Sequence, residues 1–520
     1  MSDRSLEIRA FLAILLSILF LYLYQAFLIK EQPPSEVEKR ETPEVVETKG
    51  VPFISSGEEM EIETEKFHLK LSGDGSLSSL KLKEYKVMVD EENSRVELIK
   101  AQTPPYPLTL FIYSEGNTQP TVPEMKGIKD GKEIIFKGKA GEVEVYKRYN
   151  FEDEYSFEFS IAFKNPSSQP QKLSAEIIWS SLHLSASRIY NESFKGYING
   201  KVVSKNKVKS PEKLGEAEWI AHDMKYFLGG LIPVSPPFIR TYVYPLMEKD
   251  IISFRTPLMV LPAGGEENLN FIVYCGPKIE NNLKSIKKGL EKAIDLGWFE
   301  FLAKPILYML KFFYRFIPNY GFVIILIVII VKILFFPLTR MQYRAMKKMK
   351  DIQPLIESAK KRYADDKERL QREILNIYRS YKVNPLSGCL PLLIQFPVFI
   401  ALYQVLMNAI ELRHAPFLLW IKDLSSPDTI GKIGIGGFEL AIRILPLLLG
   451  ITTYIQQKIS PQTSGGGEGE EITKWMMKIM PVFLTILFWA FPSGLVLYWC
   501  SNNIISIIEG IVMRVLAKKR

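Results

Sequence analysis

The chain has 520 residues, 47% of them hydrophobic, and a formal net charge of +9. A mean hydropathy close to zero indicates a mixture of water-soluble and membrane-embedded parts rather than an average globular protein. Three scattered cysteines exclude a disulfide framework, and basic residues beside apolar runs favour membrane topology over nucleic-acid binding as the source of the positive charge.

The amino terminus predicts an uncleaved signal-anchor helix over residues 1–30. An apolar run at residues 10–29 follows Arg4 and Arg9 and has about the 20 residues needed to cross a bilayer. A cleavable signal would be shorter and would end in small residues, whereas this run ends in aromatic residues and Lys30. We expect the amino terminus inside and residues 31–59, rich in Glu and Pro, to form an acidic tether.

Residues 60–280 predict an all-β sandwich domain. Apolar and polar residues alternate strictly at Phe67, Leu69 and Leu71, before a turn at residues 73–75, and again through residues 155–163. From Asn282 the period changes to that of an amphipathic helix, so residues 281–318 predict an interfacial helix and linker. A helix that caps the β domain is the alternative.

Five further apolar runs predict a five-helix core over residues 319–515, with spans at residues 320–338, 386–407, 440–455, 475–491 and 494–515. The last two are joined only by Pro492 and Ser493, so we expect them to form an antiparallel hairpin. Two of the spans are short, which predicts local thinning of the bilayer. The fold class is therefore a multi-pass α-helical membrane protein with six transmembrane helices and a large extracytoplasmic β domain.

Basic residues give the orientation. Residues 341–383 are rich in Lys and Arg and read as a helical hairpin with Asp365 and Asp366 at its turn; the basic tail is residues 516–520. Both should be cytoplasmic, which places both chain termini inside and the β domain outside. The hairpin residues with which a partner such as ribosomal RNA or a nascent chain would interact are Arg344, Lys347, Lys348 and Arg362. A solvated loop without a partner is the alternative.

Catalysis finds little support in the residues. The four histidines lack metal-ligand spacing, and residues 465–467 are a glycine run without the Lys and Ser or Thr of a phosphate loop, so they read as a flexible linker. We predict no enzyme activity, metal, cofactor or small-molecule substrate. A nucleophile assembled from scattered residues of the β domain stays open.

The informative feature is a set of polar residues inside apolar helices. Lys332 interrupts the first core span at a depth where a lysine costs roughly 2.5 to 3.5 kcal/mol. Its ammonium could instead extend to the cytoplasmic interface, because Pro337 lies only about 7.5 Å further along the helix. Further polar or aromatic positions are Gln395 and, in the last span, Tyr498, Trp499, Ser501, Asn502, Asn503 and Glu509.

These positions favour a water-filled hydrophilic groove, although interhelical hydrogen bonds alone would account for one or two of them. Lys332 and Glu509 lie at matching depths in helices that both run from outside to inside. We therefore expect Glu509 to approach Lys332, and a separation above about 6 Å would exclude direct pairing.

Six motifs resemble the YidC/Oxa/Alb family of membrane insertases, and in particular its Gram-negative YidC type. They are NPLSGCLPLLIQFPVFIALY at residues 384–403, PLTR at 337–340, LPLLLGITTYIQQK at 445–458, WAFPSGLVLYWCSNN at 489–503, WIAHDMKYF at 219–227 and YCGPK at 274–278. The resemblance implies a periplasmic β-supersandwich, a cytoplasmic hairpin and a groove open to cytoplasm and lipid. It implies substrate contacts at Gln395, Phe396, Tyr498 and Trp499. The family's groove cation is commonly arginine, and here it is Lys332, which keeps the charge without the bidentate geometry.

The resemblance also implies a function and partners: insertion and folding of inner-membrane proteins, alone or with the Sec translocon, in contact with translating ribosomes, nascent membrane proteins and lipids. Two rival functions are a transporter with Lys332 and Glu509 as a relay, although no inverted repeat is visible, and an anchored periplasmic sugar enzyme.

Overall fold

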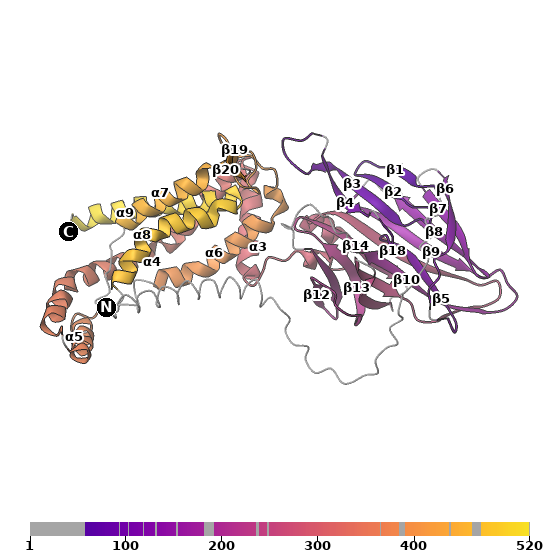
Figure 1. The fold of residues 1–520 in the computed structure, drawn as a ribbon, viewed down its shortest axis with the longest axis horizontal. Coiled ribbons are helices and arrows are strands. Elements are labelled where there is room, and N and C mark those ends of the chain that lie inside the picture. The colour runs from indigo at the N-terminus through magenta and orange to yellow at the C-terminus, as the bar shows by residue number, and fades with distance from the viewer. Residues whose placement is uncertain are drawn as a thin grey trace. The chain divides into compact units, whose positions relative to one another are not determined.

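The computed structural model describes residues 58–518, except residues 93, 102, 118, 131–132, 152–153, 181–191, 236–238, 247–248, 365, 384–389, 436–437 and 460–469. One compact unit ends at Asp295 and the other begins at Leu296; Figure 1 shows the elements of both. The expected signal anchor, nearly all of the tether and the glycine run lie outside the described residues.

The amino-terminal unit is built from antiparallel strands. β1 to β4 form a four-stranded sheet, and the other strands form a branched 14-stranded sheet in the path β17-β10-β16-β15-β13-β14-β18-β9-β8-β7-β6. The strands are β1 Met60–Glu63, β2 Phe67–Leu71, β3 Leu77–Lys86, β4 Arg95–Lys100, β5 Leu110–Ser114, β6 Glu124–Asp130, β7 Glu133–Ala140, β8 Val143–Phe151, β9 Ser156–Lys164, β10 Gln171–Ser180, β11 Ser193–Ile198, β12 Lys201–Lys205, β13 Glu212–Asp223, β14 Phe227–Ser235, β15 Arg240–Leu246, β16 Lys249–Arg255, β17 Met259–Leu261 and β18 Glu266–Pro277.

The long sheet folds over on itself at β13. The first residues of β13 pair with β15, its last residues pair with β11 and β14, and the register shifts near Gly215, whose φ is 111°. A β-bulge at such a point lets one strand belong to two layers. Phe254 of β16 and Phe271 of β18 meet across the layers with ring centroids 6.4 Å apart. The predicted β sandwich is confirmed.

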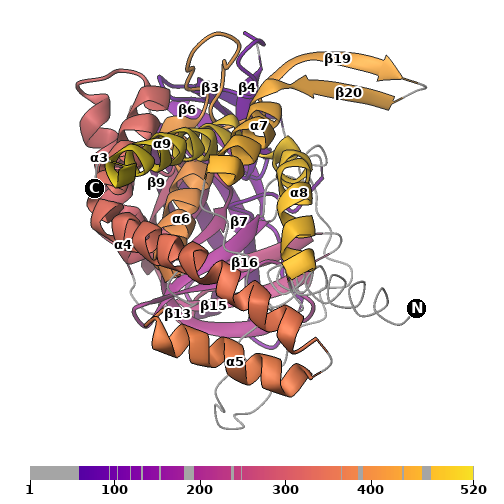
Figure 2. The ribbon, with the colours of Figure 1, turned by 90° about the vertical axis from the view of Figure 1, so that its left-hand side faces the viewer.

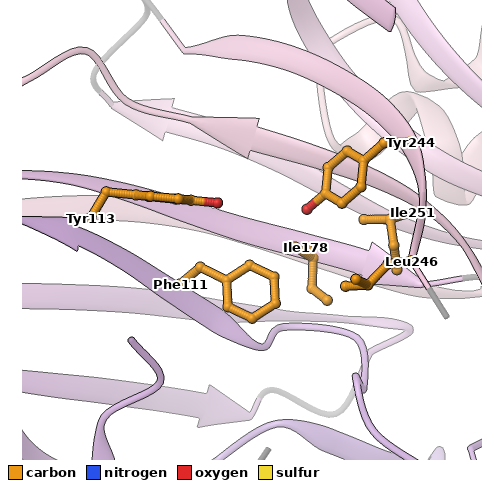
Figure 3. Packing of buried hydrophobic residues seen from close by; sticks show 6 residues of the cluster. All are labelled: Phe111, Tyr113, Ile178, Tyr244, Leu246 and Ile251. Atoms are coloured by element: carbon orange, nitrogen blue, oxygen red, sulfur yellow. The ribbon is translucent and has the colours of Figure 1, made fainter. Parts of the chain in front are cut away.

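Alternation along the chain predicts the buried face of these strands correctly. Phe67, Leu69 and Leu71 of β2 are buried, as are the odd-numbered apolar residues of β9. Figure 3 shows a further part of the core, in which β5, β10, β15 and β16 contribute six residues. The hydroxyls of Tyr113 and Tyr244 there donate to the buried carboxylate of Glu176, at 2.7 and 3.0 Å.

A buried lysine fixes the turn between β2 and β3. The Lys147 side chain of β8 is only 1% exposed, and its Nζ donates to the backbone oxygens of Asp74 and Leu108 at 2.9 and 3.1 Å. Burial would raise the pKa of the Asp74 carboxyl, but the charge of Lys147 and hydrogen bonds from Ser72 and Ser76 hold it below its ordinary value. The turn thus joins the small sheet to the large one through charge-assisted contacts.

The continuous amphipathic helix predicted from Asn282 is wrong. Residues there form the short helix α2 (Glu280–Ser285) and a 3-10 turn, η1 (Leu290–Ala293), separated by Lys287 and Gly289, both with positive φ. Leu283 and Leu290 are fully buried, and Lys195 of β11 donates to the backbone oxygen of Ala293 at 3.0 Å. The segment therefore caps the β domain, which was the alternative interpretation.

The carboxyl-terminal unit is helical. Its helices are α3 Glu300–Tyr314, α4 Tyr320–Arg362, α5 Lys367–Ser380, α6 Leu390–Asn408, α7 Ile444–Ile459, α8 Glu470–Leu487 and α9 Ser493–Lys518, with 3-10 turns η3 Ile410–Leu412 and η4 Phe488–Ala490. Among the described residues, α4 and α9 are long and apolar enough to cross a membrane, and residues 478–490 form a shorter apolar helix. The amphipathic helix of the predicted linker is α3, whose buried residues all lie on one face.

The first core span and the first arm of the basic hairpin are one helix. α4 runs for 43 residues and contains Pro337 and Pro354, so the predicted span at residues 320–338 continues into the hairpin without a break. α5 folds back on α4 around a small core of Met349, Ile352, Ile356 and Val383. Asp366 caps α5 by accepting a hydrogen bond from the Arg369 amide at 3.0 Å, as its sequence position predicts.

The span predicted to begin at residue 440 starts later. Residues 438–443 form strand β20 (Phe438–Arg443), which pairs with β19 (Thr429–Ile435), and α7 begins at Ile444. The last two helices share α7 as a neighbour, because α7 packs against both α8 and α9. Gly450 lets α8 approach closely, since a Cβ there would collide with the Thr485 hydroxyl.

Candidate functional site

Lys332 directs its ammonium at a neighbouring helix. Its Nζ donates to the Ser506 hydroxyl of α9 at 2.6 Å and lies 3.6 Å from a carboxylate oxygen of Glu509. The side chains of Lys332 and Glu509 are only 12% and 13% exposed. The expected pairing therefore meets its distance criterion, and the ammonium does not extend along α4 toward the end of the span.

One face of α9 carries the partners. Asn502, Ser506 and Glu509 are spaced four and three residues apart, which places them on the same side of a helix. The Ser506 hydroxyl donates back to the Asn502 carbonyl at 2.8 Å, so its lone pairs remain for Lys332. The Gln395 amide of α6 donates to the Asn502 side chain at 3.5 Å. We call Lys332, Gln395, Asn502, Ser506 and Glu509 the polar cluster.

Two further predicted residues, Tyr498 and Trp499, lie one turn earlier on α9 and pack against other aromatic rings. Phe399 of α6 contacts Tyr498 and Trp499, with ring centroids 6.2 and 4.9 Å away. Phe488 packs against the other side of Trp499 at 4.9 Å. Phe396, although adjacent to Gln395, is exposed. The aromatic residues therefore border the polar cluster without contacting its ammonium.

Asn503 belongs to a different contact. It is buried, and its amide donates to Thr452 and Thr453 of α7 at 3.3 and 2.9 Å. Because it is one residue from Asn502, it lies about 100° around α9 and faces α7. For Asn503 the structure therefore supports interhelical hydrogen bonding, which was the alternative to a place in the groove.

Ser506 is the member of the polar cluster that sequence reasoning missed. A serine in an apolar helix gives a weak signal by itself, because it often donates to a carbonyl one turn earlier. Its spacing to Asn502 and Glu509 was the available signal. Among the described residues, no three His, Cys, Asp or Glu side chains gather as metal ligands would.

The predicted hairpin residues are all on the outside of α4. Arg344, Lys347, Lys348 and Arg362 are exposed, whereas Met349, Ile352 and Ile356 face α5. The basic residues therefore take no part in the core of the hairpin. Apolar packing against α5 supports the arm of α4 that carries them.

Both units match known families. The family model described as "60Kd inner membrane protein" matches residues 312–520, and "YidC periplasmic domain" matches residues 59–309. The chain is 32% identical to the membrane protein insertase YidC of Syntrophus aciditrophicus over 548 aligned positions, covering 96% of this chain and 98% of the relative. The chain belongs to the YidC family.

Other YidC proteins agree. The YidC of Geobacter metallireducens is 32% identical and covers 97% of both chains, and that of Pelobacter propionicus is 43% identical over 58% of this chain and 55% of its own. A crystal structure of an active YidC insertase with its first transmembrane domain resolved aligns with 96% of this chain and 98% of that chain, at 20% identity and a TM-score of 0.39. The polar cluster lies within the part that matches the inner-membrane family.

Proposed function

We propose that this chain inserts hydrophobic segments of other proteins into the bacterial inner membrane and helps them to fold. The observation that carries the proposal is the polar cluster, in which a lysine ammonium sits between apolar helices with hydrogen-bonding partners supplied by α9. Such an arrangement is expensive in lipid and is therefore expected at a functional site. The names of the relatives, which are membrane protein insertases, support the same function.

The proposed topology has six spans: the signal anchor, α4, α6, α7, α8 and α9. Both termini and the α4–α5 hairpin are cytoplasmic, and the β domain is periplasmic. Positive charge supports this orientation, because exposed basic residues lie on the far arm of α4 and the tail carries Lys518, Lys519 and Arg520. On α4, Lys332 lies twelve residues after Tyr320 and eight before Arg340, so the polar cluster lies closer to the side of the basic hairpin.

The proposed mechanism is an exchange of partners at Lys332. The polar cluster lines a hydrophilic groove open to cytoplasm and lipid, where an acidic or polar tail of the incoming segment competes with Glu509 for the ammonium. The apolar part slides along α4, α6 and α9. Twenty apolar residues gain roughly 0.3 to 0.6 kcal/mol each on entering lipid, which outweighs a few polar costs without a nucleotide. No catalytic step is part of this function.

The proposal includes four partners. The exposed cations of the α4–α5 hairpin suit a translating ribosome, whose RNA is polyanionic. Nascent membrane proteins are the substrates, and for larger ones the proposal includes the Sec translocon as a lateral neighbour of the lipid-facing helices. Membrane lipid covers the exposed apolar residues of α7 and α9.

The test is insertion into proteoliposomes that hold the purified full chain, scored by protease protection of substrates with an acidic or a neutral tail. Lys332→Ala should lower insertion of the acidic-tailed substrate about tenfold, the effect of losing roughly 1.4 kcal/mol, and Lys332→Arg should retain it. Asn503→Ala is the matched control, because Asn503 lies on the same helix but faces α7. It should leave the ratio of acidic to neutral substrates unchanged.

Equal insertion of every substrate by Lys332→Ala would reject the role of the groove charge. Ion or solute flux through the same liposomes, without any inserted protein, would favour the rival transporter, in which Lys332 and Glu509 act as a relay.

A further inference from the structure

A two-stranded hairpin separates α6 from α7. β19 and β20 pair only with each other, with Ile433 opposite Leu440 and Gly431 opposite Ile442. Opposite residues of an antiparallel pair share a face, so these positions and the pair Ile435 and Phe438 form one side. The other side holds Lys432 opposite Ala441 and Gly434 opposite Glu439. Among the side chains that the structure describes, Ile433 and Ile442 lie on one face of the hairpin and Lys432 lies on the other.

The apolar face is uncovered where its side chains are described. Ile433 is 48% exposed and Ile442 is 38% exposed. An isolated two-stranded hairpin is marginally stable at best in water, so a persistent one needs something against its apolar side. The hairpin is short, and a second sheet to cover it is missing among the described residues of this unit.

The base of the hairpin is fixed to the ends of the helices. Asp428, just before β19, is buried and accepts hydrogen bonds from the amides of Ile444 and Leu445 at 3.0 and 2.7 Å, which caps α7. Arg443 at the end of β20 donates to the Trp489 carbonyl, next to the end of α8. The direction of the hairpin is therefore set by two helices rather than by a loose loop.

The hairpin points away from the helical bundle, to its side. In Figure 2 the hairpin extends across the ends of α7 and α8 and past the helical bundle, whereas in Figure 1 it lies at the end of the bundle opposite α5. The hairpin therefore extends beyond the helical bundle and over the medium that surrounds the helices. Beside its root, Leu447 and Ile451 of α7 are exposed apolar residues.

We propose that the β19–β20 hairpin lies on the outer surface of the bilayer with the face of Ile433 and Ile442 in the lipid and Lys432 in the head-group water. The proposal rests on the membrane placement of α7 and α8 given above, and lipid is the occupant because the exposed apolar residues Leu447 and Ile451 of α7 follow the root of the hairpin. An element with an apolar side and a polar side at a membrane surface buries the former by several ångströms.

Spin-label accessibility in proteoliposomes tests the proposal on the full chain with Cys275, Cys389 and Cys500 replaced by alanine. Nitroxides are attached after Ile433→Cys, Ile442→Cys and, as the matched control on the opposite face, Lys432→Cys. Ile451→Cys reports the lipid and Lys126→Cys of β6 reports the water. Collision with a water-soluble nickel chelate should be roughly threefold lower or more for Ile433→Cys and Ile442→Cys than for Lys432→Cys, and collision with oxygen higher.

Two other outcomes are distinguishable. If the Ile451→Cys label is in lipid but Ile433→Cys and Ile442→Cys match Lys126→Cys, the hairpin is in water; the proposal is overturned, and the apolar face is left for a protein partner. If the Ile451→Cys label is itself exposed to the chelate, the membrane placement of the proposed function fails and the hairpin proposal fails with it.

Discussion

A double-mutant cycle on Lys332 and Glu509 measures whether their contact is an interaction or a coincidence of packing. Two unit charges 3.6 Å apart attract by about 4.6 kcal/mol at an effective dielectric constant of about 20. Desolvation opposes that attraction, and both side chains keep some exposure. We therefore expect Lys332→Met and Glu509→Gln to be coupled by about 1 to 3 kcal/mol, so that the double variant loses less stability than the sum of the single ones.

The assay is unfolding of the full chain in lipid bicelles by a denaturing detergent, followed by the loss of helical circular dichroism. A second cycle, Lys332→Met with Asn503→Ala, is the control, because Asn503 bonds to α7 and shares no partner with Lys332. That cycle should be additive within about 0.5 kcal/mol. Additivity of the Lys332 and Glu509 variants at the same level would refute the inference that α9 stabilises the buried ammonium.

Two further predictions concern the parts that surround the site. Asp74→Asn should make the stability of the β domain depend less on pH in acid. The native pKa of Asp74 lies below its ordinary value, so the stabilisation by its carboxylate is present above about pH 4 and is lost as the pH falls through the native pKa. Urea unfolding of the β domain between pH 5 and pH 2 measures this dependence, and an unchanged slope of unfolding free energy against pH would contradict the prediction. Ile352→Ala should destabilise the α4–α5 hairpin by about 2 to 4 kcal/mol, because Ile352 is buried in its small core; trypsin should then cleave the hairpin faster while cleavage of the exposed variant Leu355→Ala stays at the original rate.

The sequence predicts the β domain well because alternation is a local property. Residues 67–71 and 155–163 have a period of two, and the strands bury the faces that this period selects. The same signal was present and overlooked in Phe438, Leu440 and Ile442, which alternate with polar or small residues and form β20 rather than the start of a span. An apolar run next to a helix does not by itself say where the helix begins.

Other differences come from backbone geometry that apolar patterns do not record. Residues 282–294 have the helical period, but Lys287 and Gly289 adopt positive φ and stop the helix. Conversely, Pro337 does not end α4, although a proline favours a break. Boundaries therefore depended on tertiary contacts: Leu283 and Leu290 are buried in the β domain, and the far arm of α4 is supported by α5.

For the site, the sequence predicts how deep each polar residue lies along its helix, but it does not predict which neighbouring helix the residue faces. The helical rise predicted that Lys332 and Glu509 lie at the same level, and the distance of 3.6 Å agrees. Which helices touch is a different question, because it depends on the rotation of each helix about its own axis. That rotation directs Asn503 to α7 and Asn502 to α6. Composition alone could not predict that these two adjacent asparagines contact different helices.

The polar residues of α9 have different partners, and this difference bears on how an insertase can keep a buried charge available to a substrate. If every polar residue of α9 faced one cavity, water alone would have to stabilise Lys332, and the helix would have weak contacts with its neighbours. Instead, Asn503 anchors α9 to α7, while Ser506 and Glu509 give the ammonium partners on an adjacent part of the helix surface. In the proposed mechanism, a substrate carboxylate that takes the place of Glu509 exchanges one ion pair for another, so its entry would cost less than the creation of a new buried charge. The resting contact between Lys332 and Glu509 is thus compatible with a readily reversible site.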